Sequence, residues 1–435
     1  MKRQLSGWGK NILINTNVSF PKNLSELKRN IKQGCIARGL GRSYGDSSIN
    51  PDKTIITINL KKIINFDEKN GILETETGIS IEEILNLIIK KGWFLPVTPG
   101  SKKITLGGMI ASDVHGKNHH KVGSFSNYII SLKVINYKKK IIECSKNKNT
   151  KFYNYTIGGM GLTGVIYSAK IRLKKIESNL IFEEKIKTHN LKQTLKYINL
   201  SQNWEYNVAW IDTSTSFKKL GRSIMSRGYF VNSNKNKSLF FMKNKSLFNN
   251  LPEIFPPFFM SSFVIKIFNF FYFLLSKSKK KITDIDSFFY PLDKITNWNI
   301  IYGKKGFISY QCSLPSHNSH KSIYEILRVL KENRVYSFVS VLKSMRRSRN
   351  SLSFSQKGFT LVFDFPIYKK IYKVLNKVDS IVLNYRGKVY LTKDSRISQK
   401  NFLKINKGFN KKDYKNYRKK INYYFNSLQS KRLGI

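Results

Sequence analysis

A short segment rich in glycine and histidine constrains this chain more than any other part of it. It spans residues 95–125 and reads LPVTPGSKKITLGGMIASDVHGKNHHKVGSF. Glycines such as Gly107 and Gly108 leave bare backbone that can lie against a ligand. Ser112, His115 and Asn118 place polar groups beside that backbone. The pattern predicts a segment wrapped around a large anionic cofactor, and the alternative is a glycine-rich turn region with incidental histidines.

A second glycine-rich loop precedes this segment by about 60 residues. Residues 35–50 read CIARGLGRSYGDSSIN, a strand-like entry followed by the loop. Gly39, Gly41 and Gly45 can turn free backbone amides toward a diphosphate, and Arg38 and Arg42 can neutralise its charge. Spacing alone does not separate such a loop from other glycine-rich loops, so the prediction depends on the pair of segments.

Hydrophobic periodicity places regular elements between and after these loops. Alternation and 3.6-residue spacing predict strands over residues 55–60, 72–77, 306–314 and 360–365, and helices over 81–91, 191–200 and 322–332. Two α+β halves in the middle of the chain would suit a large antiparallel sheet covering the cofactor. No internal repeat is evident in the sequence.

Composition bounds the classes of protein that the chain can belong to. Its 435 residues, 41% of them hydrophobic, suffice for two or three packed domains. The formal net charge of +52 would normally indicate a nucleic acid or an anionic membrane as partner. Lys, Asn and Ile are abundant throughout, so a general composition bias is a competing explanation. No nucleic-acid recognition motif accompanies the charge, and we therefore expect no specific nucleic-acid partner, whereas an anionic membrane surface stays an option.

The cysteines and the N-terminal residues add two exclusions. Cys35, Cys144 and Cys312 are odd in number and far apart, which excludes a disulfide framework and a cysteine-based zinc site; we expect no metal. Residues 1–15 lack the apolar stretch of a signal peptide, since Trp8 and Lys10 interrupt it. The sequence thus predicts a cytoplasmic protein, with peripheral attachment at the inner membrane as a second option.

Several motifs resemble one family of flavoenzymes along nearly the whole chain. The two glycine-rich segments resemble the diphosphate-wrapping segments of the vanillyl-alcohol oxidase class. Within that class, the sequence motifs are similar to those of the flavin-dependent oxidases of decaprenylphosphoryl-β-D-ribose, which are the flavin subunits of a 2'-epimerase. The motifs that follow in that family's order are GGMGLTGVI at 158–166, AWID at 209–212, LGRSIMSRG at 220–228, FYPLD at 289–293, YQ at 310–311, DFP at 364–366 and YLTKDSR at 390–396.

The resemblance implies a fold, a cofactor and a domain division. The fold class is α+β, a two-lobed FAD-binding domain of the vanillyl-alcohol oxidase class with an α+β substrate (cap) domain on a large antiparallel sheet. The implied division is an FAD-binding domain over 1–177, a substrate domain over 178–387 and a C-terminal return to the FAD-binding domain over 388–435. Many members of the class tether FAD through a histidine in the first loop, but that region here reads Arg42-Ser43-Tyr44. Non-covalent FAD is therefore expected.

The implied reaction is oxidation of the 2'-hydroxyl of a polyprenylphosphoryl-β-D-ribose to the 2'-keto sugar, the first half of a 2'-epimerisation. A separate NAD(P)-dependent short-chain reductase would complete the epimerisation, and the pathway would be cell-wall polysaccharide biosynthesis. One alternative is a soluble sugar-alcohol or aldonolactone oxidase of the same flavin fold. An alternative of another class is a basic nucleic-acid or membrane-binding protein with a vestigial flavin fold.

Removing hydride from a secondary alcohol also requires a group that takes the hydroxyl proton. The residues expected to act on the flavin or the sugar are Lys393, His115, Tyr44, Gln311 and Lys343. In isolation, Lys393 before Asp394 would be a surface ion pair and Tyr44 a packing tyrosine; only the resemblance favours the catalytic interpretation. Ser309 departs from the family, which has a second glutamine at that position.

The residues expected to bind FAD come from both glycine-rich segments and from two later motifs. They are Ala37, Arg38, Gly39, Leu40, Gly41, Arg42, Ser43, Tyr44, Gly45, Asp46, Gly100, Thr105, Leu106, Gly107, Gly108, Ser112, Asp113, Val114, His115, Gly116, Asn118, His119, Gly123, Gly161, Ile166 and Tyr390.

The most apolar run of the chain has two possible interpretations. Residues 254–275 read IFPPFFMSSFVIKIFNFFYFLL and are followed by the basic stretch KSKKK. Pro256, Pro257, Lys266 and Asn269 interrupt the run, and the helix expected over about 261–275 is too short to span a bilayer. It is either an interfacial element on anionic lipid or a buried helix of the substrate domain.

Overall fold

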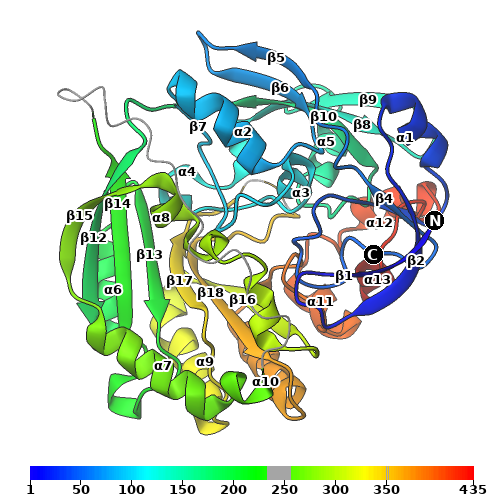
Figure 1. The fold of residues 1–435 in the computed structure, drawn as a ribbon. Helices are drawn as coiled ribbons and strands as arrows, with labels where there is room; N and C mark the ends of the chain where they lie inside the picture. The colour runs from blue at the N-terminus through cyan, green and yellow to red at the C-terminus, as the bar shows by residue number, and fades with distance from the viewer. Residues whose placement is uncertain (233–255, 349, 351) are drawn as a thin grey trace.

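The computed structural model describes residues 1–232, 256–348, 350 and 352–435, which form two lobes (Figure 1). The first two residues of the apolar run, Ile254 and Phe255, lie outside the described residues. Between the lobes pass the loops that carry both glycine-rich segments.

The first lobe contains two larger sheets and a two-stranded one. Its four-stranded sheet has the order β1 (Lys2–Ser6), β2 (Leu13–Ser19), β4 (Lys53–Ile56), β3 (Cys35–Arg38), and β4 runs parallel to both of its neighbours. Its five-stranded antiparallel sheet has the order β5 (Ile63–Asp67), β6 (Ile72–Glu76), β10 (Val165–Arg172), β8 (Ile129–Ile135), β9 (Ile141–Ser145), and β7 (Trp93–Phe94) pairs with β11 (Lys174–Lys175). The α-helices of this lobe that precede β10 are α1 (Leu24–Asn30), α2 (Ile81–Ile88), α3 (Leu106–Ala111), α4 (His119–Val122) and α5 (Thr150–Thr156).

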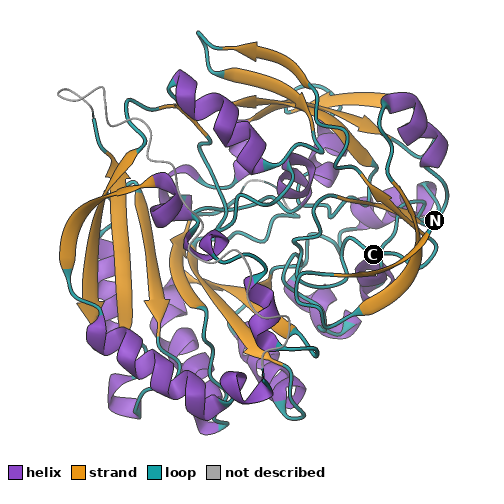
Figure 2. Cartoon of the chain, viewed as in Figure 1, coloured by secondary structure: helices purple, strands orange, loops and turns teal. Residues whose placement is uncertain are grey.

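The second lobe is built on an antiparallel sheet that has eight strands within the described residues. The order is β15 (Lys279–Asp284), β12 (Leu180–Thr188), β14 (Ser223–Phe230), β13 (Tyr206–Ile211), β17 (Ser340–Met345), β18 (Gly358–Pro366), β16 (Phe307–Pro315), β19 (Lys388–Val389). Helices α6 (Leu191–Leu200), α9 (Ser319–Glu332) and α10 (Ile371–Asn384) pack on its strands, and α8 (Ile285–Phe289) follows its edge strand (Figure 2). The predicted antiparallel sheet and the α+β fold class are thereby confirmed.

Local chemistry explains why most predicted elements form. The helix predicted over 81–91 exists as α2 with a final 3₁₀ turn, Ile89–Lys91. Ser80 and Glu83 form a reciprocal capping box at its start, and the apolar positions Ile84 and Ile88 are buried. Strands β16 and β18 are buried nearly throughout because helices cover one face and the first lobe the other.

One predicted strand is wrong in its second half. The strand expected over 55–60 ends at Ile56 in β4, and the chain then turns, with the Leu60 amide donating to the Thr57 carbonyl at 2.9 Å. The apolar side chain of Leu60 is buried beneath α1 rather than aligned along a strand. The hydrophobic side chain of Leu60 therefore indicates that the position is buried, but it does not indicate that the backbone forms a strand there.

The C-terminal segment packs against the start of the chain. It contains α11 (Gln399–Ile405), α12 (Lys412–Lys420) and α13 (Leu428–Leu433). Phe425 forms a bridge with Cys35 and packs with Leu27 and Ile31 of the first lobe. The domain boundaries at 177 and 387 stay a prediction.

Helix α7 (Ser262–Leu275) buries a single narrow stripe. Ile265, Asn269 and Phe273 are buried, whereas most of its other large side chains are exposed. A buried core helix is therefore the wrong interpretation of this segment. Among the helices that could be described, none combines the length and apolarity needed to cross a membrane.

Candidate active site

The two glycine-rich segments touch each other and the C-terminal YLTKDSR loop. A Cβ atom on Gly39 would lie 2.0 Å from Oγ1 of Thr105, the N-cap of α3. A Cβ atom on Gly45 would lie 2.1 Å from the carbonyl oxygen of Asp394. These two glycines are thus required by close packing between chain segments, which the sequence interpretation had assigned to diphosphate binding alone.

The FYPLD motif holds the second glycine segment in place. Ser101 Oγ donates to Asp293 Oδ1 and the Lys102 amide donates to Asp293 Oδ2, both at 2.7 Å. The Tyr290 hydroxyl is hydrogen-bonded to Thr98. These hydrogen bonds join two segments that lie about 190 residues apart in the sequence, and they hold the two lobes together at this point.

The two arginines of the first loop have different surroundings. Arg38 Nη2 donates to the Ser6 carbonyl at 2.7 Å, so its guanidinium is engaged within the protein. Arg42 lies over the Trp8 ring at 3.8 Å, and its buried Nε has no hydrogen-bond partner among the described residues. Arg42 is therefore the arginine with donor capacity left for an anionic ligand.

His115 lies at the centre of a hydrogen-bonded chain that joins the two lobes. Thr360 Oγ1 donates to the Cys312 carbonyl at 2.8 Å, so it must accept the hydrogen bond from Gln311 Nε2 at 3.0 Å. The same amide nitrogen lies 2.9 Å from His115 Nε2, which makes Nε2 the acceptor. The ring proton is then on Nδ1, which faces Lys343 Nζ at 3.3 Å.

This assignment requires Lys343 as a neutral amine, and its surroundings favour that form. Burial, followed by the charges of Lys393 and Lys117, lowers the pKa of Lys343 to about 7. Burial and Lys343 likewise lower the pKa of His115 well below its ordinary value. The surroundings therefore shift His115 and Lys343 toward their neutral forms.

Lys393 lies on the other side of the site, beside the first loop. Its ammonium nitrogen is 4.4 Å from the centre of the Tyr44 ring, which packs edge-on against Phe307. Burial lowers the pKa of Lys393, while the carboxyl of Asp364 opposes that shift. Burial also raises the pKa of Asp364, and Ser309 donates a hydrogen bond to it. Lys393 is thus not a surface ion pair.

Two charged neighbours of the site were missed by sequence reasoning. Asp364 stands in the quoted DFP motif without an assigned role, and nothing local marks it as the acid beside Lys393. Lys117 lies within the second glycine segment, 4.3 Å over the Phe288 ring, and burial lowers its pKa to about 8. Its position between Gly116 and Asn118 could have indicated a role in the site, but lysines are so common in this chain that the position of one of them predicts little.

The remaining predicted ligands of FAD line the same region or support it. His119 has both ring nitrogens engaged within the protein, Nδ1 by the Arg346 amide and Nε2 by Ser124 Oγ, so it is held as a neutral structural group. Asp113 is buried and accepts from the Ser126 amide. Ile166 is the second residue of β10, and Gly161 precedes that strand and lies near Ile36 of β3.

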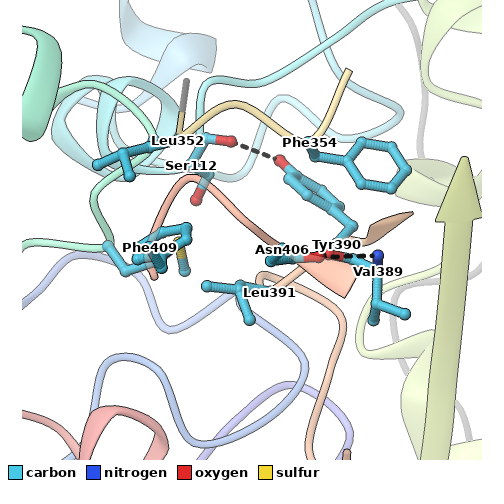
Figure 3. Close-up of a pocket in the computed structure, with 10 residues that line it drawn as sticks. Ser112, Leu352, Phe354, Val389, Tyr390, Leu391, Asn406 and Phe409 are labelled. Atoms are coloured by element: carbon cyan, nitrogen blue, oxygen red, sulfur yellow. Dashed lines mark hydrogen bonds between the residues drawn. The ribbon is translucent and has the colours of Figure 1, made fainter. Parts of the chain in front are cut away.

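Tyr390, the first residue of the C-terminal YLTKDSR loop, packs against the second glycine segment at Ser112 (Figure 3). Its hydroxyl donates to the Ser112 carbonyl at 2.9 Å, and its ring lies 5.3 Å from that of His115. Behind it, a small cavity is bordered by apolar Leu352, Phe354 and Phe409 and by polar Ser112 and Asn406. The cavity lies beside the cluster of basic groups and is too small for more than a minor part of a ligand.

The residues present fit an anionic, extended cofactor such as FAD. Gly108 is exposed although Leu106 and Met109 on either side of it are buried, and a Cβ there would meet only Thr105 Oγ1, at 3.3 Å. Gly100 borders open space. This bare backbone, the unsatisfied Arg42 Nε and the pair of Lys343 and Lys393 form a cradle suited to phosphates and to a ring that takes up negative charge.

Comparisons with known proteins agree with this geometry. Residues 22–145 match the family described as an FAD binding domain. The decaprenylphosphoryl-beta-D-ribose oxidase of Mycolicibacterium smegmatis is 29% identical over 418 residues, which covers 92% of this chain and 90% of that protein. Two further relatives match a smaller part of the chain: the human Delta(24)-sterol reductase is 26% identical over 27% of this chain and 23% of its own length, and the D-lactate dehydrogenase of Archaeoglobus fulgidus is 27% identical over 31% and 32%.

Proposed function

We propose that this FAD-dependent oxidoreductase oxidises the 2'-hydroxyl of a polyprenylphosphoryl-β-D-ribose. The observation that carries the proposal is the length of the similarity. The sterol reductase and the lactate dehydrogenase match about a quarter to a third of the chain, whereas the ribose oxidase matches 92% of it, substrate-domain strands included.

The chemistry of the second lobe supports the same substrate. Both amide hydrogens of Gln311 are taken up by His115 and by Thr360 on the adjacent strand, which leaves its carbonyl oxygen as an acceptor for a sugar hydroxyl. Lys343 and Lys117 provide cationic groups for a phosphate. Two carboxyls act on this cluster, Asp364 on Lys393 and Glu183 on Lys117, so an anionic substrate meets more cationic than acidic groups.

In the proposed reaction, bound FAD supplies the acceptor for the hydride that leaves the sugar carbon. The protein must orient the hydroxyl and remove its proton. We assign this task to Lys393, because its pKa is lowered and it lies against the Tyr44 ring. His115 and Gln311 fix the position of Lys343, which we assign to the substrate phosphate. The 2'-keto sugar would pass to a separate NAD(P)-dependent short-chain reductase.

The test is anaerobic loss of the flavin absorbance. Polyprenylphosphoryl ribose should bleach the enzyme, whereas the prenyl phosphate without sugar should bind and leave the spectrum oxidised. Bleaching by free pentitols or aldonolactones, with none by the lipid-linked sugar, would assign the chain to the soluble sugar oxidases instead. Absence of any bound flavin would support the vestigial alternative.

Acid denaturation is expected to release FAD into the supernatant. The first loop has Ser43 and Tyr44 where a tethering histidine would stand, and both ring nitrogens of His115 are engaged by Gln311 and Lys343. The check is the absorbance of supernatant and pellet after precipitation. Yellow protein in the washed pellet would contradict non-covalent binding.

The KM for the phosphorylated sugar is expected to depend on the charge of Lys343. Its pKa of about 7 means that the amine is charged below that pH and neutral above it. A phosphate prefers the charged form, so KM should rise above pH 7 by a factor approaching about tenfold per pH unit. Lys343→Met should have the high KM at every pH and a flat profile above about pH 7. An unchanged slope in that variant would remove Lys343 from phosphate binding.

A further inference from the structure

Helix α7 and the turn before it present an apolar ridge to solvent. We define the aromatic ridge as Phe258, Phe263, Phe270, Phe271, Leu274 and Leu275. Phe263 is 66% exposed and Leu275 73% exposed. Scattered exposed apolar residues are normal on a protein surface, but a contiguous group of this kind marks an interaction site.

A buried polar contact fixes which side of α7 faces outward. Asn269 Nδ2 donates to Asp212 Oδ1 at 3.2 Å and to the Ser337 carbonyl at 3.3 Å. The Asp212 carboxylate is itself held by Arg222 at 2.7 Å. Rotation of the helix to bury the ridge would break these contacts in a region that excludes water. The exposure of the ridge is therefore built into the fold.

A basic groove lies directly beside the ridge. We define the groove as Lys219, Arg222, Lys266 and Lys331, which line one pocket together with hydroxyl-bearing Ser214, Thr215 and Ser216 and the ridge residue Phe270. Burial and the neighbouring charge of Lys266 lower the pKa of Lys331. Arg222 has its carboxylate partner in Asp212, and Lys331 donates to the Ser214 carbonyl. The mutual repulsion within the groove would be relieved by an anion.

More positive charge follows at the C-terminal end of the helix. Lys277, Lys279 and Lys280 are exposed, while Lys281 is paired with Glu183. The ridge is thus bordered by cations along its length and at its end. An apolar strip flanked by lysines complements the boundary between acyl chains and anionic headgroups.

We propose that this face docks on the surface of an anionic phospholipid bilayer, with the aromatic ridge in the headgroup–acyl boundary and the basic groove on a lipid phosphate. The helix has 14 residues and is about 21 Å long, too short to cross a hydrocarbon core of about 30 Å. It therefore lies in the interface plane. A nucleic acid would match the charge but would leave the ridge in water.

The docking face begins close to the candidate active site. Met260, at the start of this region, packs in one cluster with Trp298, Tyr302, Phe307 and Tyr44. The ammonium group of Lys393 in turn lies over the ring of Tyr44. This placement goes beyond the proposed function, and it would hold the site near the bilayer whichever substrate it accepts.

Co-sedimentation of the flavin-loaded protein with vesicles tests the proposal without any substrate. We expect binding to phosphatidylcholine vesicles that contain phosphatidylglycerol, weaker binding to phosphatidylcholine alone, and loss of binding with added salt. Lys219→Glu with Lys266→Glu should weaken binding to the anionic vesicles about tenfold or more. Phe263→Ser with Leu275→Ser should weaken binding to both kinds of vesicle.

Matched controls lie at the opposite end of the molecule in Figure 1. Ile64 is an exposed apolar residue on β5, and Lys90 is an exposed lysine near the end of α2. Ile64→Ser and Lys90→Glu should bind vesicles like the unmodified protein. Every variant should keep its flavin absorbance and its melting temperature, because the substituted side chains are exposed.

Four results would overturn the proposal. The first is an unmodified protein that stays in the supernatant with anionic vesicles. The second is a ridge or groove variant that binds no differently from its control. The third is a protein that is dimeric by light scattering and becomes monomeric on Phe263→Ser, because the ridge would then bind a second copy of the chain. Salt-sensitive DNA binding that the groove variant loses, without vesicle binding, would assign the charge to nucleic acid.

Discussion

Lys393→Ala is expected to slow the reduction of the flavin by substrate on the order of 10² or more while leaving FAD bound, the usual scale for loss of a positioned acid–base or electrostatic group. Lys393 lies on Tyr44 at 4.4 Å with Asp364 as its nearby acid. The two glycine-rich segments, which we expect to hold the diphosphate, do not depend on this side chain. Anaerobic stopped-flow measurements with polyprenylphosphoryl ribose provide the rate.

Saturation with substrate separates the two roles open to Lys393. If it only binds phosphate, saturating sugar restores the reduction rate; if it acts in the hydride-transfer step, the deficit persists. Lys388→Ala is the matched control, because Lys388 is a neighbouring, partly buried lysine whose ammonium donates to the Ser353 carbonyl. A Lys393→Ala protein that reduces its flavin at the unmodified rate would leave His115 and Tyr44 as the groups to test.

Arg432→Leu is expected to lower the free energy of unfolding by about 3–5 kcal/mol. Arg432 donates from Nε and Nη2 to the Asp46 carboxylate, at 3.0 Å each, and from Nη2 to Asp394 at 2.8 Å. Both carboxylates are only 3% exposed, so the substitution leaves two buried charges without their counter-ion. Urea unfolding at neutral pH measures the loss, and flavin content should fall with it, since Asp46 closes the first loop.

The control for this substitution is the preceding residue. Lys431 pairs with Asp52 at 3.2 Å, but the two side chains are 48% and 59% exposed. Solvent screens such a pair, and Lys431→Leu should change the free energy of unfolding by no more than about 1 kcal/mol. The pH dependence gives a second check. Burial raises the folded-state pKa of Asp46, and removing Arg432 raises it further, so the deficit of Arg432→Leu should shrink as the pH falls and Asp46 takes up a proton. An equal effect of both substitutions would mean that the burial of Asp46 and Asp394 is unimportant.

Local signals in the sequence predicted much of the fold. The capping box of α2 and the periodicity of α6, α9, β16 and β18 are properties of neighbouring residues, and these elements lie where they were expected. Leu60 shows the limit, because a buried residue in a turn has the same hydrophobicity as one in a strand. For α7, composition left burial and exposure open, and only the packing of Asn269 on Asp212 decides which stripe is hidden.

The sequence predicted which types of residue form the candidate site, but not which of these residues contact one another. His115 and Lys343 are 228 positions apart, and no local rule selects that lysine among the 78 lysines and arginines of the chain. The resemblance supplied it. What the resemblance did not supply were the partners that set its charge: the Thr360 hydroxyl, which orients Gln311 and thereby the ring proton of His115, and Lys117, which adds to the cost of charging Lys343.

The contact of Arg432 with Asp46 spans 386 positions and also sets the order in which the chain can fold. On the ribosome, the first glycine loop is made long before the arginine that neutralises its aspartate exists. The large sheet and its helices draw their contacts from the middle of the sequence and can assemble first, as a unit. Closing the first lobe requires the two ends of the chain to meet, which is a slow, long-range step. Uptake of FAD should therefore be a late event in the maturation of this protein, completed only after synthesis has delivered residue 432.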